Sequence, residues 1–163
     1  MNRMSKQMTR DAAIVEVMQS LRRIIKCLQD YSQKVYRHYG ITGPQLWALK
    51  TIYQSGSLSL GELSKDMYLH PSTISGLVDR LEKKGVVLRD RNEEDRRIVK
   101  VQLTPKGNRV VKRAPKPVQG KMIYGLRKLK KDDLILIYHS VLKLVEIMEA
   151  QNVKATFLFD QET

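Results

Sequence analysis

The sequence predicts a mainly α-helical fold that contains one small β-hairpin. Apolar residues recur at spacings of three and four near both ends of the chain, which is typical of helices with an apolar face. Two capping boxes, the Ser/Thr-x-x-Glu/Gln pattern that opens helices, lie in the middle of the chain. After Gly85 the apolar period changes to two, which indicates strands.

Length and composition fit a single domain. The chain has 163 residues, of which 42% are apolar, and this is enough for a hydrophobic core. The single cysteine, Cys27, has no intrachain disulfide partner and points to a reducing compartment, so we expect a cytoplasmic protein. The apolar stretch from Ala12 to Met18 contains Glu16 and is too short for a signal peptide or a membrane span.

Basic residues outnumber acidic residues along the whole chain. There are 30 Lys and Arg against 17 Asp and Glu, which gives a formal net charge of +13 and an isoelectric point near 9.9. No basic tail accounts for this excess, so we expect it on a folded surface. The charge predicts a polyanionic partner, which could be DNA, RNA or an anionic membrane.

The N-terminal segment predicts one long helix from about residue 11 to residue 39. Its apolar residues alternate at spacings of three and four and form a narrow seam. Such a seam can pack on another helix of the same chain or on a second subunit, and we favour the second subunit because of its length. The seam consists of Ile14, Val17, Leu21, Ile24, Leu28, Tyr31 and Val35.

Two short helices with clear start signals come next. Thr42 and Gln45 form a capping box that opens a helix over about residues 43–53, which ends at Gly56. A second box begins at Ser59 and opens a helix that ends near Met67.

Residues 68–70 then form a tight turn, and Pro71 opens a further helix that ends at Gly85. This helix begins with small polar residues on its exposed face, so the pair of helices is a helix-turn-helix. We expect His70 to be a turn or capping residue rather than a metal ligand.

A hairpin and two further helical segments complete the chain. Val86–Leu88 begins one strand and residues 99–103 alternate along another, and a hairpin directly after a helix-turn-helix is the outline of a winged helix. Thr104 and Pro105 begin another helix, which Pro115 and Pro117 must kink sharply or divide in two. A last helix over about residues 132–148 carries a second apolar seam.

These motifs resemble the multiple-antibiotic-resistance regulators, the MarR family of winged helix-turn-helix transcription factors. The wing pattern Asp-x-Arg followed by Leu-Thr is specific when it comes after a helix-turn-helix. The similarity is carried by Ile41–Leu49, Leu60–Leu63, Ser72–Gly85, Asp95–Arg97 and Leu103–Gly107.

The resemblance implies a homodimer that binds a pseudo-palindromic operator in double-stranded DNA, and so a nucleoid-associated protein without a membrane partner. Residues 1–40 would be the N-terminal dimerisation helix, residues 41–107 the DNA-binding domain, and residues 108–163 the C-terminal dimerisation helices and tail. The family makes repression the default and leaves a transcriptional activator as an alternative. Pro115 and Pro117 depart from the family's long, straight fifth helix.

Two groups of residues are candidates for DNA contact. Neutral side chains at a helix N-terminus can meet base edges and phosphates in the major groove, and a wing arginine can enter the minor groove. The alternative for Arg80 is an ion pair with Asp79, Glu82 or the wing, and for the wing it is a solvated charged loop. The recognition-helix candidates are Pro71, Ser72, Thr73, Ser75, Gly76 and Arg80, and the wing candidates are Asp95, Arg96 and Arg97.

Two regulatory mechanisms follow from the resemblance. Many family members release DNA when a small aromatic acid occupies a crevice between the dimerisation helices and the winged helix. Others sense peroxides through a cysteine, but Cys27 lies further along the first helix than that cysteine does, so we expect a buried structural residue. The crevice candidates, which are otherwise core or interface residues, are Tyr36, His38, Tyr39, Trp47 and Tyr68.

Nothing in the sequence indicates an enzyme. His38, His70 and His139 fall in different elements, and no nucleophile lies at a suitable spacing from a base. We expect no catalytic residues, no metal and no cofactor, and we expect a small-molecule inducer as the only ligand besides DNA.

Overall fold

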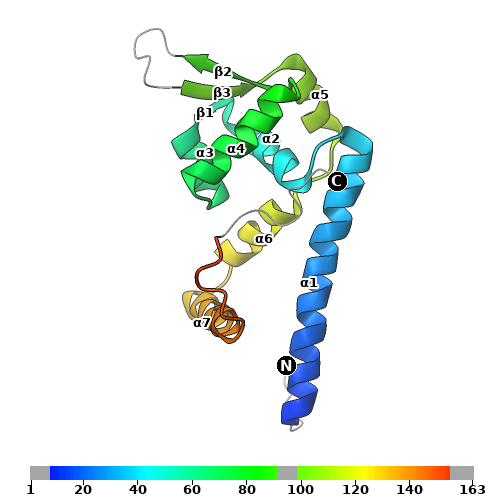
Figure 1. Ribbon diagram of the computed structural model, residues 1–163, viewed down its shortest axis with the longest axis vertical. Coiled ribbons are helices and arrows are strands. Elements are labelled where there is room, and N and C mark those ends of the chain that lie inside the picture. The colour runs from blue at the N-terminus through cyan, green and yellow to red at the C-terminus, as the bar shows by residue number, and fades with distance from the viewer. Residues whose placement is uncertain (1–7, 92–98, 155–163) are drawn as a thin grey trace.

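The computed structural model describes residues 8–91 and 99–154 and confirms a mainly helical fold with a small antiparallel sheet (Figure 1). The predicted N-terminal helix, helix-turn-helix, hairpin and C-terminal helices all form. The helices are α1 (Arg10–Tyr39), α2 (Gly43–Ser55), α3 (Leu60–Met67), α4 (Pro71–Lys83), α5 (Pro105–Arg113), α6 (Val118–Arg127) and α7 (Lys131–Ile147). The strands are β1 (Ser57–Ser59), β2 (Val87–Arg91) and β3 (Val99–Leu103).

The apolar seam of α1 meets two different environments. At its C-terminal end Leu28 and Val35 are buried, and the helix packs on α2 there. Over its N-terminal half the seam is open to solvent, and Ile14 and Ile24 are about half exposed. One continuous sequence pattern therefore packs on the chain's own core at one end only.

Local capping sets the starts of the central helices as predicted. Thr42 and Gln45 make both bonds of the first capping box, and Ser59 and Glu62 make both bonds of the second. Each box satisfies backbone N–H groups that a helix leaves unpaired at its first turn.

The sheet has three strands in the order β1-β3-β2, one more than the hairpin that the sequence predicts. β1 pairs antiparallel with β3, and its Leu58 lies opposite Val101. Both side chains are buried. A strand of three residues shows too little alternation to be recognised in the sequence, and its last residue, Ser59, also caps α3.

The hydrophobic core lies within the winged-helix unit, between α2, α3, α4 and the sheet. Helix α5 packs against α2 and β3 of this unit. Fully buried side chains from every layer meet there. They include Leu46, Leu49, Ile52, Leu63, Met67, Ile74, Leu77, Leu81 and Val101.

Pro115 and Pro117 divide the C-terminal region into two helices, one of the two outcomes that the sequence predicts. Helix α5 ends at Arg113 and α6 begins at Val118, and neither helix continues through the prolines. The chain then turns again before α7.

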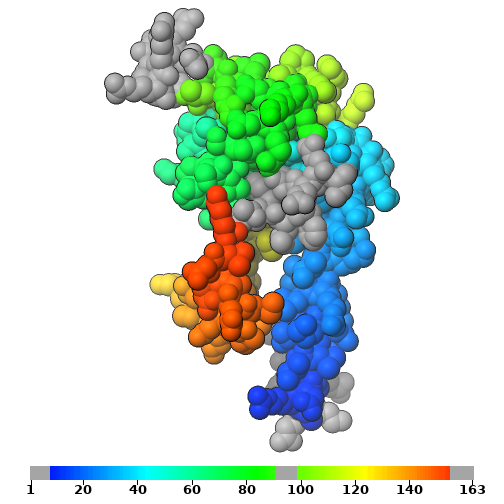
Figure 2. Space-filling view, viewed as in Figure 1, coloured from blue at the N-terminus to red at the C-terminus, as the bar shows by residue number. Residues whose placement is uncertain are grey.

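Helices α6 and α7 lie wholly in the described part of the chain, and none of their residues is buried. Figure 2 shows an opening between the C-terminal helices and α1. The apolar seam of α7 is uncovered in the single chain, where Tyr138 is 56% exposed and Val141 is 51% exposed. Within the described residues, no helix combines the length and apolarity that crossing a membrane requires.

Candidate DNA-binding site

The helix-turn-helix is built on α3 and α4, with the turn at residues 68–70. Tyr68 ends α3 in the left-handed conformation, with φ of 54°. The backbone N–H of Leu69 donates to the carbonyl of Ser64 at 3.0 Å, and the Ser64 hydroxyl donates to the carbonyl of Leu69. This reciprocal pair closes the turn and sets the direction in which α4 leaves it.

His70 is the N-cap of α4, which confirms the predicted capping role. Its Nδ1 accepts from the backbone N–H of Ser72 at 3.3 Å and lies 2.9 Å from the Ser72 hydroxyl oxygen. The imidazole is thus held by the first turn of the helix. Among the described residues no cluster of three or more His, Cys, Asp or Glu side chains is placed to hold a metal ion.

The start of α4 presents its side chains at different depths. Pro71 and Ser72 are exposed, whereas Ser75 and Gly76 are half-buried. The Thr73 hydroxyl oxygen is buried and has no hydrogen-bond partner among the described residues. Of the two leading residues Ser72 and Thr73, only Ser72 therefore offers its hydroxyl to a ligand outside the chain.

Arg80 lies one turn after Gly76, on the same face of α4. Its side chain turns back toward the helix start, because an Nη1 atom lies 3.8 Å from where a Cβ on Gly76 would stand. Arg80 is half-buried rather than fully extended into solvent. Asp79 and Glu82, which the sequence offers as its acidic partners, both pair with Arg89.

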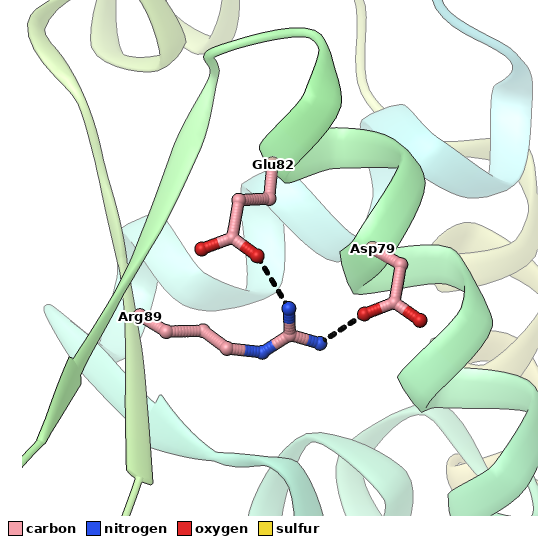
Figure 3. Close-up of polar contacts among 3 residues, drawn as sticks. All are labelled: Asp79, Glu82 and Arg89. Carbon is pink, nitrogen blue, oxygen red and sulfur yellow. Dashed lines mark hydrogen bonds and ion pairs between the residues drawn. The ribbon is translucent and has the colours of Figure 1, made fainter.

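Arg89 of β2 makes those ion pairs and joins the wing to the recognition helix (Figure 3). One guanidinium nitrogen donates to Asp79 and the other to Glu82, one turn apart on α4. Partial burial lowers the pKa of the Arg89 guanidinium, but the hydrogen bonds to both carboxylates outweigh it and raise that pKa. The base of the wing is thereby fixed to α4.

The wing tip, with the predicted residues Asp95, Arg96 and Arg97, lies outside the described residues. Its base is described by the register of β2 and β3, in which Asp90 faces Lys100.

The five aromatic and histidine residues predicted to line a ligand crevice lie on α1, on α2 and at the helix-turn-helix turn. Tyr36 and His38 are exposed near the end of α1, and Tyr39 donates its hydroxyl to the carbonyl of Arg113 at 2.9 Å. Trp47 belongs to the core. Tyr68 is 63% exposed at the helix-turn-helix turn.

Tyr68 lies instead beside an open pocket of about 340 Å³ at the start of α4. The Tyr68 hydroxyl accepts from Arg127 Nη2 at 2.8 Å, which links the turn to the end of α6. Lys154 reaches the Ser72 hydroxyl at 3.3 Å. The pocket is lined by Tyr68, Leu69, His70, Ser72 and Lys154.

Cys27 is exposed on α1, so the prediction of a buried cysteine is wrong for the single chain. The sequence pattern places it on the turn between Ile24 and Leu28, but among the described residues that stretch of the seam remains uncovered. Burial of a helix face depends on what packs against it, and the local period does not contain that information.

Three residues of this region were not identified from the sequence as site residues: Arg89, Arg127 and Lys154. Arg89 is part of a recognisable charged run at the wing, but its pairing with α4 depends on the distance between two elements. Arg127 and Lys154 reach the helix-turn-helix from sequence separations of 59 and 82 residues. No local pattern signals contacts at such separations.

The comparisons with known proteins agree with this architecture. The family model described as MarR family matches residues 41–99. The HTH-type transcriptional regulator YsmB of Bacillus subtilis (strain 168) is 36% identical over 98 residues, which is 60% of this chain and 67% of that protein.

Two further relatives cover more of the chain. The HTH-type transcriptional repressor MdtR of Bacillus subtilis (strain 168) is 26% identical over 147 residues, which is 88% of this chain and 95% of that protein. The crystal structure of a MepR-like protein complexed with pseudoligands has a TM-score of 0.56 at 29% identity and covers 83% of this chain and 93% of that one. These relatives are regulators and not enzymes, and this chain belongs to the MarR family of DNA-binding, winged helix-turn-helix transcriptional regulators.

Proposed function

We propose that the chain is a homodimeric repressor that binds a pseudo-palindromic operator and releases it when a small aromatic or anionic ligand binds. The observation that carries this proposal is the exposed polar start of α4 within a helix-turn-helix, on a chain of net charge +13. A helix start of this kind presents short polar side chains to base edges and phosphates in the major groove.

In this proposal α4 enters the major groove and the wing reaches the adjacent minor groove. The exposed Ser72 hydroxyl contacts DNA, and Thr73 contributes its methyl group because its hydroxyl is buried. Arg97 enters the minor groove, where a narrow A·T-rich stretch concentrates negative potential. Further DNA contacts come from Pro71, Ser75, Gly76, Arg80 and Arg96, and Asp95 fixes the wing turn by pairing with Arg97 or with backbone N–H groups.

A second copy of the chain is the proposed partner of the uncovered apolar faces on α1 and α7. Ile24 on α1 is 54% exposed, and Tyr138 on α7 is 56% exposed in a helix without a buried residue. Contiguous apolar surface of this kind marks an interaction site. Pairing through both ends of the chain would place two copies of α4 about one helical turn of DNA apart.

The pocket beside Tyr68 is the proposed ligand site. Its volume of about 340 Å³ is within the range of small-molecule sites, and Lys154 supplies a cation for an anionic group. The structure of the MepR-like relative with pseudoligands supports ligand control, and the name of the relative MdtR supports repression.

Selection from randomised duplex DNA tests the operator. The full chain is mixed with the pool, and the bound fraction is sequenced. We expect an inverted repeat whose half-sites lie about one helical turn apart. Enrichment of a single half-site would contradict the dimeric mode of binding.

Benzoate, used as the probe, tests the ligand site on the selected duplex. It is titrated into the complex formed by the parent chain and by Lys154→Gln. We expect release from the parent and a weaker effect on the variant, because Lys154 is the cation of the pocket. Equal release from both chains would exclude this pocket as the site.

Exposure of Cys27 supports a second candidate, a redox-sensing regulator. DNA binding of the parent and of Cys27→Ser is titrated against cumene hydroperoxide. Loss of binding in the parent alone supports the redox mechanism, whereas equal sensitivity of the two proteins contradicts it.

A further inference from the structure

The end of α5 is held by side chains from two other helices. Pro115 and Pro117 stop the helix, so its last carbonyl groups have no intrahelical donor. Lys50 Nζ of α2 donates to the carbonyl of Val111 at 2.7 Å and to that of Ala114 at 2.9 Å. The Tyr39 hydroxyl donates to the carbonyl of Arg113 at 2.9 Å. We call Lys50, Tyr39 and these three carbonyl groups the α5 clamp.

An ammonium group suits this position. The C-terminal end of a helix carries a partial negative charge, and a cation there satisfies both that charge and the unpaired carbonyls. Burial, together with the positive charge of Lys116, lowers the pKa of the Lys50 amino group. Holding a partly desolvated cation costs free energy, and the two carbonyl groups offset that cost.

Two arms with uncovered apolar faces leave the winged-helix unit: α1 is one, and α6 with α7 is the other. The α5 clamp lies where both arms begin. Tyr39 is the last residue of α1, and the chain passes from Ala114 directly into the link to α6 and α7 (Figure 1). Helix α6 is held near its start, where Gly120 lies against the indole ring of Trp47, and at its end, where Arg127 donates to the Tyr68 hydroxyl. The α5 clamp is the contact that joins the base of α1 and the base of this C-terminal arm to the winged-helix unit at one corner.

We propose that Lys50 and Tyr39 are positioning residues that fix the angle between the winged-helix unit and its arms, and with it the half-site spacing that the protein accepts. This inference rests on the proposed homodimer. Two rigid lobes fit one spacing only, because each inserted base pair both separates and rotates the half-sites. Without the α5 clamp, the link through residues 114–117 has unpaired carbonyls and the lobes can follow a changed spacing.

The test uses the inverted repeat selected from random DNA and four derivatives, in which the spacer is one or two base pairs longer or shorter. The proteins are the full-length parent, Lys50→Met, Tyr39→Phe and the control Lys112→Met. Lys112 is an exposed cation of α5, so its loss removes the same charge near the α5 clamp without removing the clamp.

We expect the parent and Lys112→Met to lose about tenfold or more in affinity for each base pair of altered spacing. Lys50→Met should bind the best spacing more weakly and lose less than about threefold per base pair. Tyr39→Phe keeps the aromatic ring and removes one hydrogen bond, so its spacing preference should lie between the two.

Light scattering at the concentrations of the titration separates this inference from the homodimer proposal. A monomeric parent contradicts both. A dimeric parent whose spacing preference is unchanged in Lys50→Met and in Tyr39→Phe overturns the positioning role alone. If thermal unfolding shows that Lys50→Met does not fold, the spacing preference of Tyr39→Phe alone tests the positioning role. A preference equal to that of the parent then overturns it.

Discussion

The side chain of Arg89 joins the wing to the recognition helix through two ion pairs. Arg89 lies on β2, and its two carboxylate partners lie one turn apart on α4. The Arg89 side chain is half-buried, and its planar fork matches two acceptors at once. The sequence shows a charged wing, but which arginine turns inward depends on strand register.

Substitution of Arg89 by Met should detach the wing base from α4. We expect a loss of about 1 kcal/mol in the free energy of unfolding, because both carboxylates are partly exposed and remain solvated. DNA affinity should fall as well. Urea unfolding and DNA titration are compared with Lys83→Met, which removes an exposed cation from α4. Equal values for the two variants would exclude the joining role.

Tyr31 provides a pH-dependent prediction. Its hydroxyl is buried without a partner, and burial raises the pKa of this group to about 12. The raised pKa means that the folded chain holds the phenol proton more tightly than the unfolded chain, whose pKa is 10.0. The folded state therefore keeps its full stability below pH 10 and loses part of it as the pH rises from 10 toward 12. Tyr31→Phe should be at least as stable at pH 7 and should lose less stability between those pH values, as urea unfolding would show. A steeper alkaline loss in the variant would contradict this assignment.

Thr73 and Ser72 make a matched pair at the start of α4. Thr73→Val keeps the methyl group and removes an unpaired buried hydroxyl, so we expect unchanged DNA affinity and stability that is equal or higher. Ser72→Ala removes an exposed hydroxyl and should weaken DNA binding by about tenfold. Fluorescence anisotropy on the selected duplex measures both, and a larger loss in Thr73→Val would reverse their roles.

At the scale of elements, the starts and ends of helices can be predicted from neighbouring residues, whereas contacts between elements cannot. Both capping boxes, the His70 cap and the break at the two prolines follow from neighbouring residues. Strand β1 depends on a partner strand far along the sequence, and the exposure of Cys27 depends on what packs against α1, which the described part of the chain leaves open there. For the same reason the contacts of Lys50 with α5 have no sequence signature.

Gly107 shows how closely α5 approaches the start of the hairpin. A Cβ at this position would lie 2.0 Å from the carbonyl oxygen of Val86, a backbone atom that cannot move aside. Gly107→Ala should therefore destabilise the chain by about 1–3 kcal/mol. Gly125→Ala on α6 is the control, because a Cβ there meets nothing within 4 Å. Thermal unfolding should show a lower midpoint for Gly107→Ala only, and equal midpoints would contradict the close approach.

At the scale of the whole molecule, the uncovered faces and the positive charge have a joint explanation. A winged-helix unit with a complete core carries two arms whose apolar residues remain exposed. Pairing of two chains would cover these faces and would also bring together two net charges of +13. Such a charge accelerates encounter with DNA and makes affinity depend on salt, while neutral residues of α4 select the site.

Substitution of Ile24 by Glu should dissociate the dimer. The residue is 54% exposed in the single chain, and a carboxylate there cannot be buried against an apolar partner without a large penalty. Arg22→Glu is the control, because two residues along a helix differ by about 200° in direction. Light scattering should give the single-chain mass of 18.9 kDa for Ile24→Glu and twice that mass for the control. A dimeric Ile24→Glu would remove this face from the interface.

The most direct test of the account is a titration of the selected inverted repeat with the full chain at several salt concentrations. We predict two chains per duplex and a loss of about 10³–10⁵ in affinity between roughly 50 and 200 mM salt, as expected for about 6–10 phosphate contacts. One chain per duplex, or an affinity that hardly changes with salt, would contradict a homodimer that reads DNA through its two recognition helices.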